Sequence, residues 1–113
     1  MTLQYTLPFQ PQQVSNTGTD LLVLSTSPTS LLFRNGRVRF ANTTAGAVTI
    51  KAWALPAGAS AADSNCILPT LSLAANTYVD LNLPIMDAGA ILHAQAGAAT
   101  SITASCLDGL IQT

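Results

Sequence analysis

Apolar and polar residues alternate along most of the chain with a period of two. In the stretch 37–55, two such runs (37–42 and 47–55) flank a small polar tetrad. Because successive side chains of a strand point to opposite sides of a sheet, each run predicts a strand with one buried face. The tetrad contains Gly46, which tolerates positive φ, so we expect the two strands to pair as an antiparallel hairpin.

The second of these runs separates two kinds of side chain. Ile50 and Ala52 share the face that we assign to the core, whereas Trp53 and Leu55 fall on the opposite face. An exposed Trp beside a Leu is unusual on a monomer, and aromatic side chains often anchor protein interfaces. We therefore expect Trp53 and Leu55 to be exposed and to contact a partner.

Further alternating runs are separated by turn residues. Asn35-Gly36, the strongest short hairpin-turn signal, is expected to turn the chain. Pro69 is expected to confine its strand to a sheet edge or a bulge. Residues 59–65 predict a single helical turn capped by Ser60. The additional strands predicted are 20–26, 31–34, 66–73, 77–83, 90–96 and 101–107.

About eight short strands with turn chemistry between them predict an all-β fold. An antiparallel, jelly-roll-like β-sandwich fits this number of strands, and an immunoglobulin-like sandwich is the alternative. Residues 1–18 contain Pro8 and Pro11, and we expect them to form an extended N-terminal arm. Residues 19–113 are expected to form a single domain. The N-terminal residues do not have the pattern of a secretory signal.

Charge is sparse in this chain. Charged residues make up 8% of the sequence, against roughly 25% in a typical soluble domain. Interface cores are depleted in Lys, Glu and Asp, so we expect the chain to function inside an assembly. A surface made polar by Ser, Thr, Asn and Gln is the alternative. The net charge of −1 gives no electrostatic basis for binding nucleic acid or an anionic membrane. The charge-free stretch 88–107 is too polar for a membrane helix.

Three of the four basic residues lie close together at Arg34, Arg37 and Arg39. Arg37 and Arg39 project from the same strand face, an arrangement suited to holding carboxylates of a partner. The alternative is a solvated strand face that discourages aggregation of sheets.

Candidate catalytic chemistry is faint. His93 is the single histidine, so any hydrolytic triad would have to use it, and no G-x-S-x-G motif is present. No zinc-ligand spacing or calcium-loop motif occurs either. We expect no enzymatic activity, no cofactor and no metal, although a calcium ion between loops stays an alternative. Cys66 and Cys106 lie in apolar runs and are expected to be buried thiols rather than a disulfide.

The sequence LPAG at residues 55–58, followed by DSN at 63–65, is the most specific part of a longer pattern that runs from residue 38 to 109. This pattern resembles that of small β-sandwich structural proteins of tailed bacteriophages. Such proteins occur as capsid decoration (cement) proteins and as tail or fibre modules.

The resemblance implies a non-enzymatic virion protein, assembled in the host cytoplasm, that binds and stabilises the assembled capsid lattice. It further implies a homotrimer whose partner is the major capsid protein or another virion protein. Residues 1–37 carry none of the resemblance, and we expect a partner-specific arm there, with Tyr5 and Phe9 as contacts.

Two alternatives stay open. One is a tail, fibre or baseplate module that binds a carbohydrate receptor, for which Trp53, Tyr5 and Tyr78 are the aromatic candidates. The other is a hydrolase that depends on His93.

Overall fold

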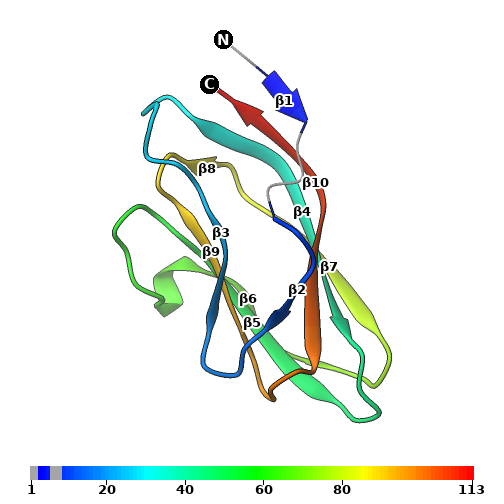
Figure 1. Ribbon diagram of the computed structural model, residues 1–113. Coiled ribbons are helices and arrows are strands. Elements are labelled where there is room, and N and C mark those ends of the chain that lie inside the picture. The colour runs from blue at the N-terminus through cyan, green and yellow to red at the C-terminus, as the bar shows by residue number, and fades with distance from the viewer. Residues whose placement is uncertain (1–2, 6–8) are drawn as a thin grey trace.

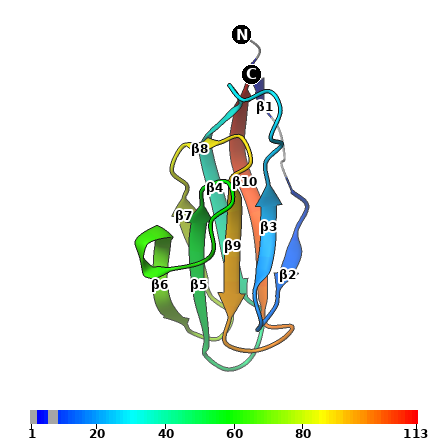
Figure 2. The same ribbon diagram turned by 90° about the vertical axis from the view of Figure 1, so that its left-hand side faces the viewer.

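The computed structural model describes residues 3–5 and 9–113, which form two antiparallel β-sheets packed face to face (Figures 1 and 2). A short 3-10 helix, η1 (Asp63–Asn65), interrupts the strands. The described strands are β1 (Leu3–Tyr5), β2 (Gln12–Val14), β3 (Thr19–Val23), β4 (Leu32–Asn42), β5 (Val48–Leu55), β6 (Cys66–Leu73), β7 (Tyr78–Asn82), β8 (Met86–Asp87), β9 (Ile91–Ala96) and β10 (Ile102–Gln112).

The order of the strands is that of a jelly roll. The larger sheet runs β1-β10-β4-β7, with β2 also paired to β10 and β8 to β4, and the smaller sheet runs β3-β9-β5-β6. The last strand, β10, thus lies beside the first strands. From β2 to β5 and from β8 to β10 each strand is followed by one in the other sheet. The expected all-β, jelly-roll-like sandwich is confirmed.

The strands β4 and β5 do not form the hairpin that their short linker suggests. β4 pairs with β10, β7 and β8, whereas β5 pairs with β6 and β9 in the other sheet. The connection from β4 to β5 forms a corner between the two sheets, and Asn42, only 2% exposed, lies in this corner and bonds to both sides of it. Its Nδ2 donates to the carbonyls of Gly46 at 2.9 Å and Leu73 at 3.1 Å, and its Oδ1 accepts the N–H of Thr44 at 2.9 Å. The hairpin prediction was wrong because alternation shows which face of a strand is buried but not its neighbour.

Asn35-Gly36 is not a turn either, because both residues lie inside β4. Asn35 has a φ of 56°, and the two residues face Gly109, so that β4 bulges at this point. A Cβ added at Gly36 or Gly109 would overlap the ring of Phe33. Gly36 therefore provides room for a buried aromatic ring within a continuous strand.

The core lies between the two sheets and is almost entirely apolar. Its largest fully buried hydrophobic side chains are Phe33, Phe40, Ile50, Leu92 and Ile102. These side chains come from both sheets, as the alternation predicts for a sandwich.

The N-terminal segment is attached to the sandwich along β10. β1 and β2 both pair with β10, and Phe9 and Val14 belong to the hydrophobic core. Phe9 is therefore buried in its own chain and is not the accessible contact that we expected. Tyr5 lies in β1 opposite Leu110, but its side chain falls outside the described part of the structure.

Several local predictions are confirmed. Pro69 lies in β6, an edge strand of the smaller sheet whose pairing with β5 is irregular nearby. The helical turn is η1, although its N-cap is Ala62 rather than Ser60. The Oδ1 of Asn65 accepts the N–H of Ala62 at 3.0 Å. Both cysteines are free thiols, with Cys106 buried and Cys66 half-buried.

Candidate interaction surfaces

Two of the three arginines on β4 are bound within their own chain. Arg39 donates from Nε and Nη2 to the two carboxylate oxygens of Asp80, at 2.7 and 3.0 Å. Its guanidinium also lies 4.0 Å from the centre of the Tyr78 ring. Arg34 donates from Nη1 to Oε1 of Gln112 at 3.0 Å. We expected Arg37 and Arg39 to hold carboxylates of a partner together. Because Arg39 is engaged by Asp80, Arg37 alone is left for such a contact.

The ion pair of Arg39 and Asp80 shifts the pKa values of both groups so that each charged form is favoured. Hydrogen bonding to Asp80 raises the pKa of Arg39. Hydrogen bonding to Arg39 lowers the pKa of the Asp80 carboxyl below its ordinary value. This pair joins β4 to the edge strand β7 on the outer face of the larger sheet. Both charges are therefore paired within the chain, which leaves little charge for a partner.

Arg37 is exposed and faces Asn82 on β7 and Asp108 on β10. Within the described residues it has no ion pair. Together with Asn35 these side chains line a depression of about 350 Å³ beside the bulge of β4. The sequence shows the cluster of arginines but not this depression. The depression lies beside the bulge at Asn35-Gly36, and the sequence of these two residues predicts a turn instead.

Trp53 lies on the predicted side of its strand but is not exposed. It faces His93 of β9, outside the core cluster, yet only 7% of its surface is accessible. The His93 ring is centred 5.4 Å away, and Lys51 Nζ lies 5.2 Å from the centre of the indole. Leu55 is likewise only 5% exposed. The expectation of an exposed Trp53–Leu55 contact was wrong, because both side chains are buried within the single chain, and His93 and Lys51 lie beside the indole.

Among the described residues, His93 is paired with an acidic side chain but with no nucleophile. Its Nδ1 lies 2.7 Å from Oδ1 of Asp20 on the edge strand β3. A Cβ added at Gly18 would lie 2.7 Å from His93 Nε2. In a Ser-His-Asp triad the second ring nitrogen faces the serine. Here a glycine packs against that nitrogen, so the pair ties β3 to β9 and does not form a triad.

The strands β6 and β7 lie side by side at one side of the sandwich (Figure 2), and side chains of both strands are incompletely covered there. Leu68 and Leu71 of β6 pair with the buried residues Ala52 and Ile50, and therefore point into the sandwich. Val79 and Leu81 of β7 do the same from the other sheet. Leu71 is nevertheless 36% exposed, and the other three are half-buried. We call these four residues the β6–β7 edge.

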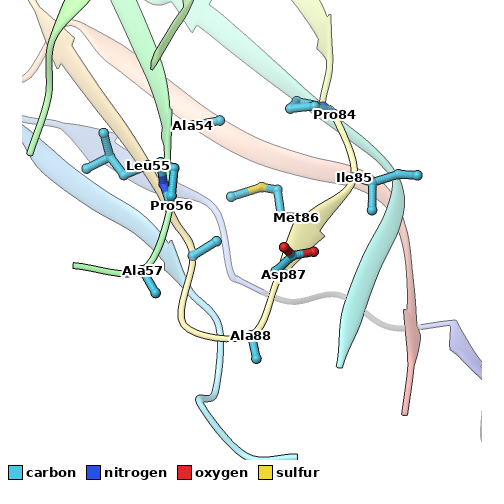
Figure 3. A pocket seen from close by; sticks show the side chains of 10 residues that line it. Ala54, Leu55, Pro56, Ala57, Pro84, Ile85, Met86, Asp87 and Ala88 are labelled. Atoms are coloured by element: carbon cyan, nitrogen blue, oxygen red, sulfur yellow. The ribbon is translucent and has the colours of Figure 1, made fainter. Parts of the chain in front are cut away.

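An apolar cavity of about 450 Å³ opens between the end of β5 and the segment around β8. Figure 3 shows Met86 extending from β8 toward Ala54 and Leu55. Asp87 is the one ionisable residue among the described residues that line the cavity, so the cavity suits an apolar group. Its lining consists of Ala54, Leu55, Pro56, Ala57, Pro84, Ile85, Met86, Asp87, Ala88 and Ala90.

No other chemistry-bearing cluster emerges within residues 3–5 and 9–113. Nowhere there do three or more His, Cys, Asp or Glu side chains come together as a possible metal site. Burial raises the pKa of the Cys106 thiol, which disfavours the reactive thiolate. Over the same residues, no helix is long and apolar enough to cross a membrane.

Comparison with known proteins finds similarity in structure but not in sequence. No family model and no curated protein matches the chain. A chain in a structure of infectious bursal disease virus, Gx strain, superposes with a TM-score of 0.50 at 13% identity. The match covers 97% of this chain and 32% of that one.

Two other solved structures of the same virus are also similar. A chain of its T13 particle has a TM-score of 0.49 at 10% identity, over 97% of this chain and 30% of that one. A chain of the Gt strain has a TM-score of 0.34 at 12% identity, over 97% and 32%. The present chain thus spans about a third of the chains that it matches. At such low identity the likeness to the Gx-strain chain shows the fold alone, in agreement with the jelly roll.

Proposed function

We propose that this chain is a non-enzymatic structural protein of a virion, and specifically a capsid decoration protein. The observation that carries the proposal is a jelly roll in which one side, the β6–β7 edge, leaves inward-pointing apolar side chains partly exposed. Jelly rolls recur in viral capsids, lectins and cupins. Contact with another chain would cover these partly exposed apolar side chains.

Three further observations support a structural role over an enzymatic one. The chain has a single histidine, and that side chain is paired with Asp20 and covered by Gly18. The solved chain with a TM-score of 0.50 comes from a structure of a virus. The sparse charge of the surface is in keeping with extensive contacts between subunits.

The proposed assembly is a homotrimer that contacts the capsid lattice. The β6–β7 edge is suited to contacts between copies, because β6 contains no charged residue. The major capsid protein, or another virion protein, would bind elsewhere on the trimer. A protein that binds only the assembled lattice stabilises it by mass action.

Particles produced with and without this protein test the proposal directly. We expect particles without it to come apart at a lower temperature, and addition of the purified chain to restore their stability. Unassembled capsid subunits should bind it weakly, which serves as the control. The proposal fails if particles produced with and without the protein are equally stable and if the purified chain does not bind to particles that lack it. Density for the jelly roll on the tail or baseplate would instead assign the protein to that part of the virion.

The contact between copies can be tested separately by light scattering during size-exclusion chromatography. We expect a trimer for the native chain and a monomer for Leu71→Lys, because the substitution places a charge at the β6–β7 edge. Leu107→Lys is the matched control, since Leu107 lies in β10 and is 38% exposed, close to the 36% of Leu71. A native chain that stays monomeric at micromolar concentration contradicts the trimer.

A further inference from the structure

The depression beside the bulge of β4 brings together four polar side chains from three strands. Asn35 and Arg37 come from β4, Asn82 from β7 and Asp108 from β10. Within the described residues, the side chains of Asn35, Arg37 and Asn82 form no hydrogen bond. At about 350 Å³ the depression lies at the small end of the range of ligand pockets.

The backbone around this depression is held in place. The N–H of Leu83 donates to the carbonyl of Gly36 at 2.8 Å, which fastens the end of β7 to the bulge. The N–H of Gly109 donates to Oδ1 of Asp108 at 2.9 Å, which orients the carboxylate and leaves Oδ2 free to bind. A site whose groups are positioned before binding loses less entropy when a ligand arrives.

The charges of the depression restrict what it can bind. Arg37 is opposed by Asp108, so a simple anion would meet the carboxylate and a simple cation would meet the guanidinium. A neutral ligand avoids both penalties. A guanidinium donates only, a carboxylate accepts only, and each of the two Asn amides does both. Vicinal hydroxyl groups, which donate and accept at once, match this set.

An aromatic side chain lies on the same strand face. Tyr78, Asp80 and Asn82 alternate along the outer face of β7, so Tyr78 lies about 13 Å from Asn82 at ~3.3 Å per residue. Tyr78 is 58% exposed, and one face of its ring is held by Arg39 at 4.0 Å. The C–H face of a sugar ring can pack on the other face.

We propose that the outer face of the larger sheet binds a neutral oligosaccharide. One sugar ring is held by hydrogen bonds to Asn35, Arg37, Asn82 and Asp108 in the depression, and another packs on Tyr78. This site is independent of the decoration role, because neither the β6–β7 edge nor attachment to a particle is involved.

Nuclear magnetic resonance titration of the full chain tests this proposal. The probes are the methyl glycosides of glucose, galactose, mannose and N-acetylglucosamine, and a linear trisaccharide of each. At least one probe should shift the backbone amides of residues 35–37, 82 and 108–109 in a saturable manner. The absence of such shifts for every probe, at the highest soluble concentration, would overturn the proposal.

Substitutions then assign the roles of the residues. Arg37→Ala and Asn82→Ala should each weaken binding of the responding glycoside by about tenfold, because each removes a direct hydrogen bond. Tyr78→Ala should weaken binding of the trisaccharide and leave the methyl glycoside unchanged. Arg34→Ala is the matched control, since Arg34 lies on the same strand but outside the depression, and it should change neither affinity.

Glycine and a short acidic peptide serve as competing probes in the same titration. Tighter binding of glycine than of any sugar would assign the depression to a zwitterion, and tighter binding of the peptide would assign it to a protein partner. Either result contradicts the oligosaccharide site. Unchanged sugar affinity in both Arg37→Ala and Asn82→Ala, with the fold retained, contradicts it as well.

Discussion

The side chain of Asn42 donates a hydrogen bond to the carbonyl of Leu73 at 3.1 Å, and this bond connects the two sheets of the sandwich. Asn42 is the last residue of β4 in one sheet, and Leu73 is the last residue of β6 in the other. Asn42 is 2% exposed and also bonds to Gly46 and Thr44 of the linker. One buried amide therefore links the end of β4 to the end of β6 and to the linker between β4 and β5.

Asn42→Ala should lower the free energy of unfolding by about 2–4 kcal/mol, because it removes hydrogen bonds to the carbonyls of Gly46, Leu73 and Ala74 and to the N–H of Thr44, all at a buried or partly buried corner. Urea denaturation followed by circular dichroism measures this change. Asn16→Ala is the control: Asn16 is exposed and only its backbone carbonyl accepts a bond, from Gln95, so a change within about 0.5 kcal/mol is expected. Equal effects of the two substitutions would show that Asn42 does not hold the corner.

Gly36→Ala should destabilise the fold by about 1–3 kcal/mol, because the added methyl group would overlap the Phe33 ring. Thermal and urea unfolding both report the loss. Gly46→Ala provides the comparison, since a Cβ there meets nothing within 4 Å, and it should be neutral. The double substitution Gly36→Ala with Phe33→Leu should cost less than the sum of the two single changes. Strict additivity would contradict the proposed contact.

The sequence predicts the class of fold well because alternation is a local property. The predicted run 66–73 coincides with β6, and the inward faces of β4 and β9 follow the pattern. Alternation does not reveal which strands become neighbours, so the β4–β5 connection was misread as a hairpin. At this connection Asn42 donates a hydrogen bond to the carbonyl of Leu73, which is distant in the sequence and which alternation does not reveal.

The candidate sites were harder to predict, because burial on the outer face of a sheet depends on side chains from other strands. Trp53 was assigned to the correct side, but the sequence does not show that His93 and Lys51 cover it. Arg39 was seen as free because its partner Asp80 lies about forty residues away in the sequence. Asn35-Gly36 has the composition of a turn. Its role as a bulge is understood only from the structure, in which Gly36 makes room for the Phe33 ring.

Because of the ion pair between Arg39 and Asp80, the free energy of unfolding should decrease as the pH becomes acidic. The folded-state pKa of Asp80 is lowered from its ordinary value of 3.8, so the pair's contribution is fully present above that value. It is lost as the pH falls through the lowered pKa. The unfolding midpoint of Asp80→Asn should therefore lie below that of the native chain at neutral pH and approach it at acidic pH.

Asp63→Asn is the control for this measurement. Asp63 is exposed and its Oδ1 lies 4.0 Å from Lys51 Nζ, a separation at which a surface pair contributes little. The difference between its midpoint and that of the native chain should be small at every pH. The difference for Asp80→Asn should also shrink at high salt, because both partners are accessible to solvent. A difference that persists at the lowest pH would contradict the assignment.

Trp53 provides the sharpest distinction between an interface residue and a residue that supports the fold. With 7% of its surface accessible in the single chain, most of its contacts form during folding. Trp53→Ala should therefore lower the free energy of unfolding by about 3–5 kcal/mol, and Trp53→Phe by less.

Two measurements on these Trp53 variants separate the two roles. The indole emission of the native chain should be blue-shifted, as for an indole shielded from water, and should move to the red on unfolding. Association of the folded fraction, followed by size-exclusion chromatography, should be unchanged in Trp53→Phe, because the indole is already covered by Lys51 and His93 of its own chain. If Trp53→Ala instead left unfolding unchanged and abolished association, the indole would have to be exposed by a movement of these neighbours. Trp53 would then be an anchor of the assembly rather than a support of the smaller sheet.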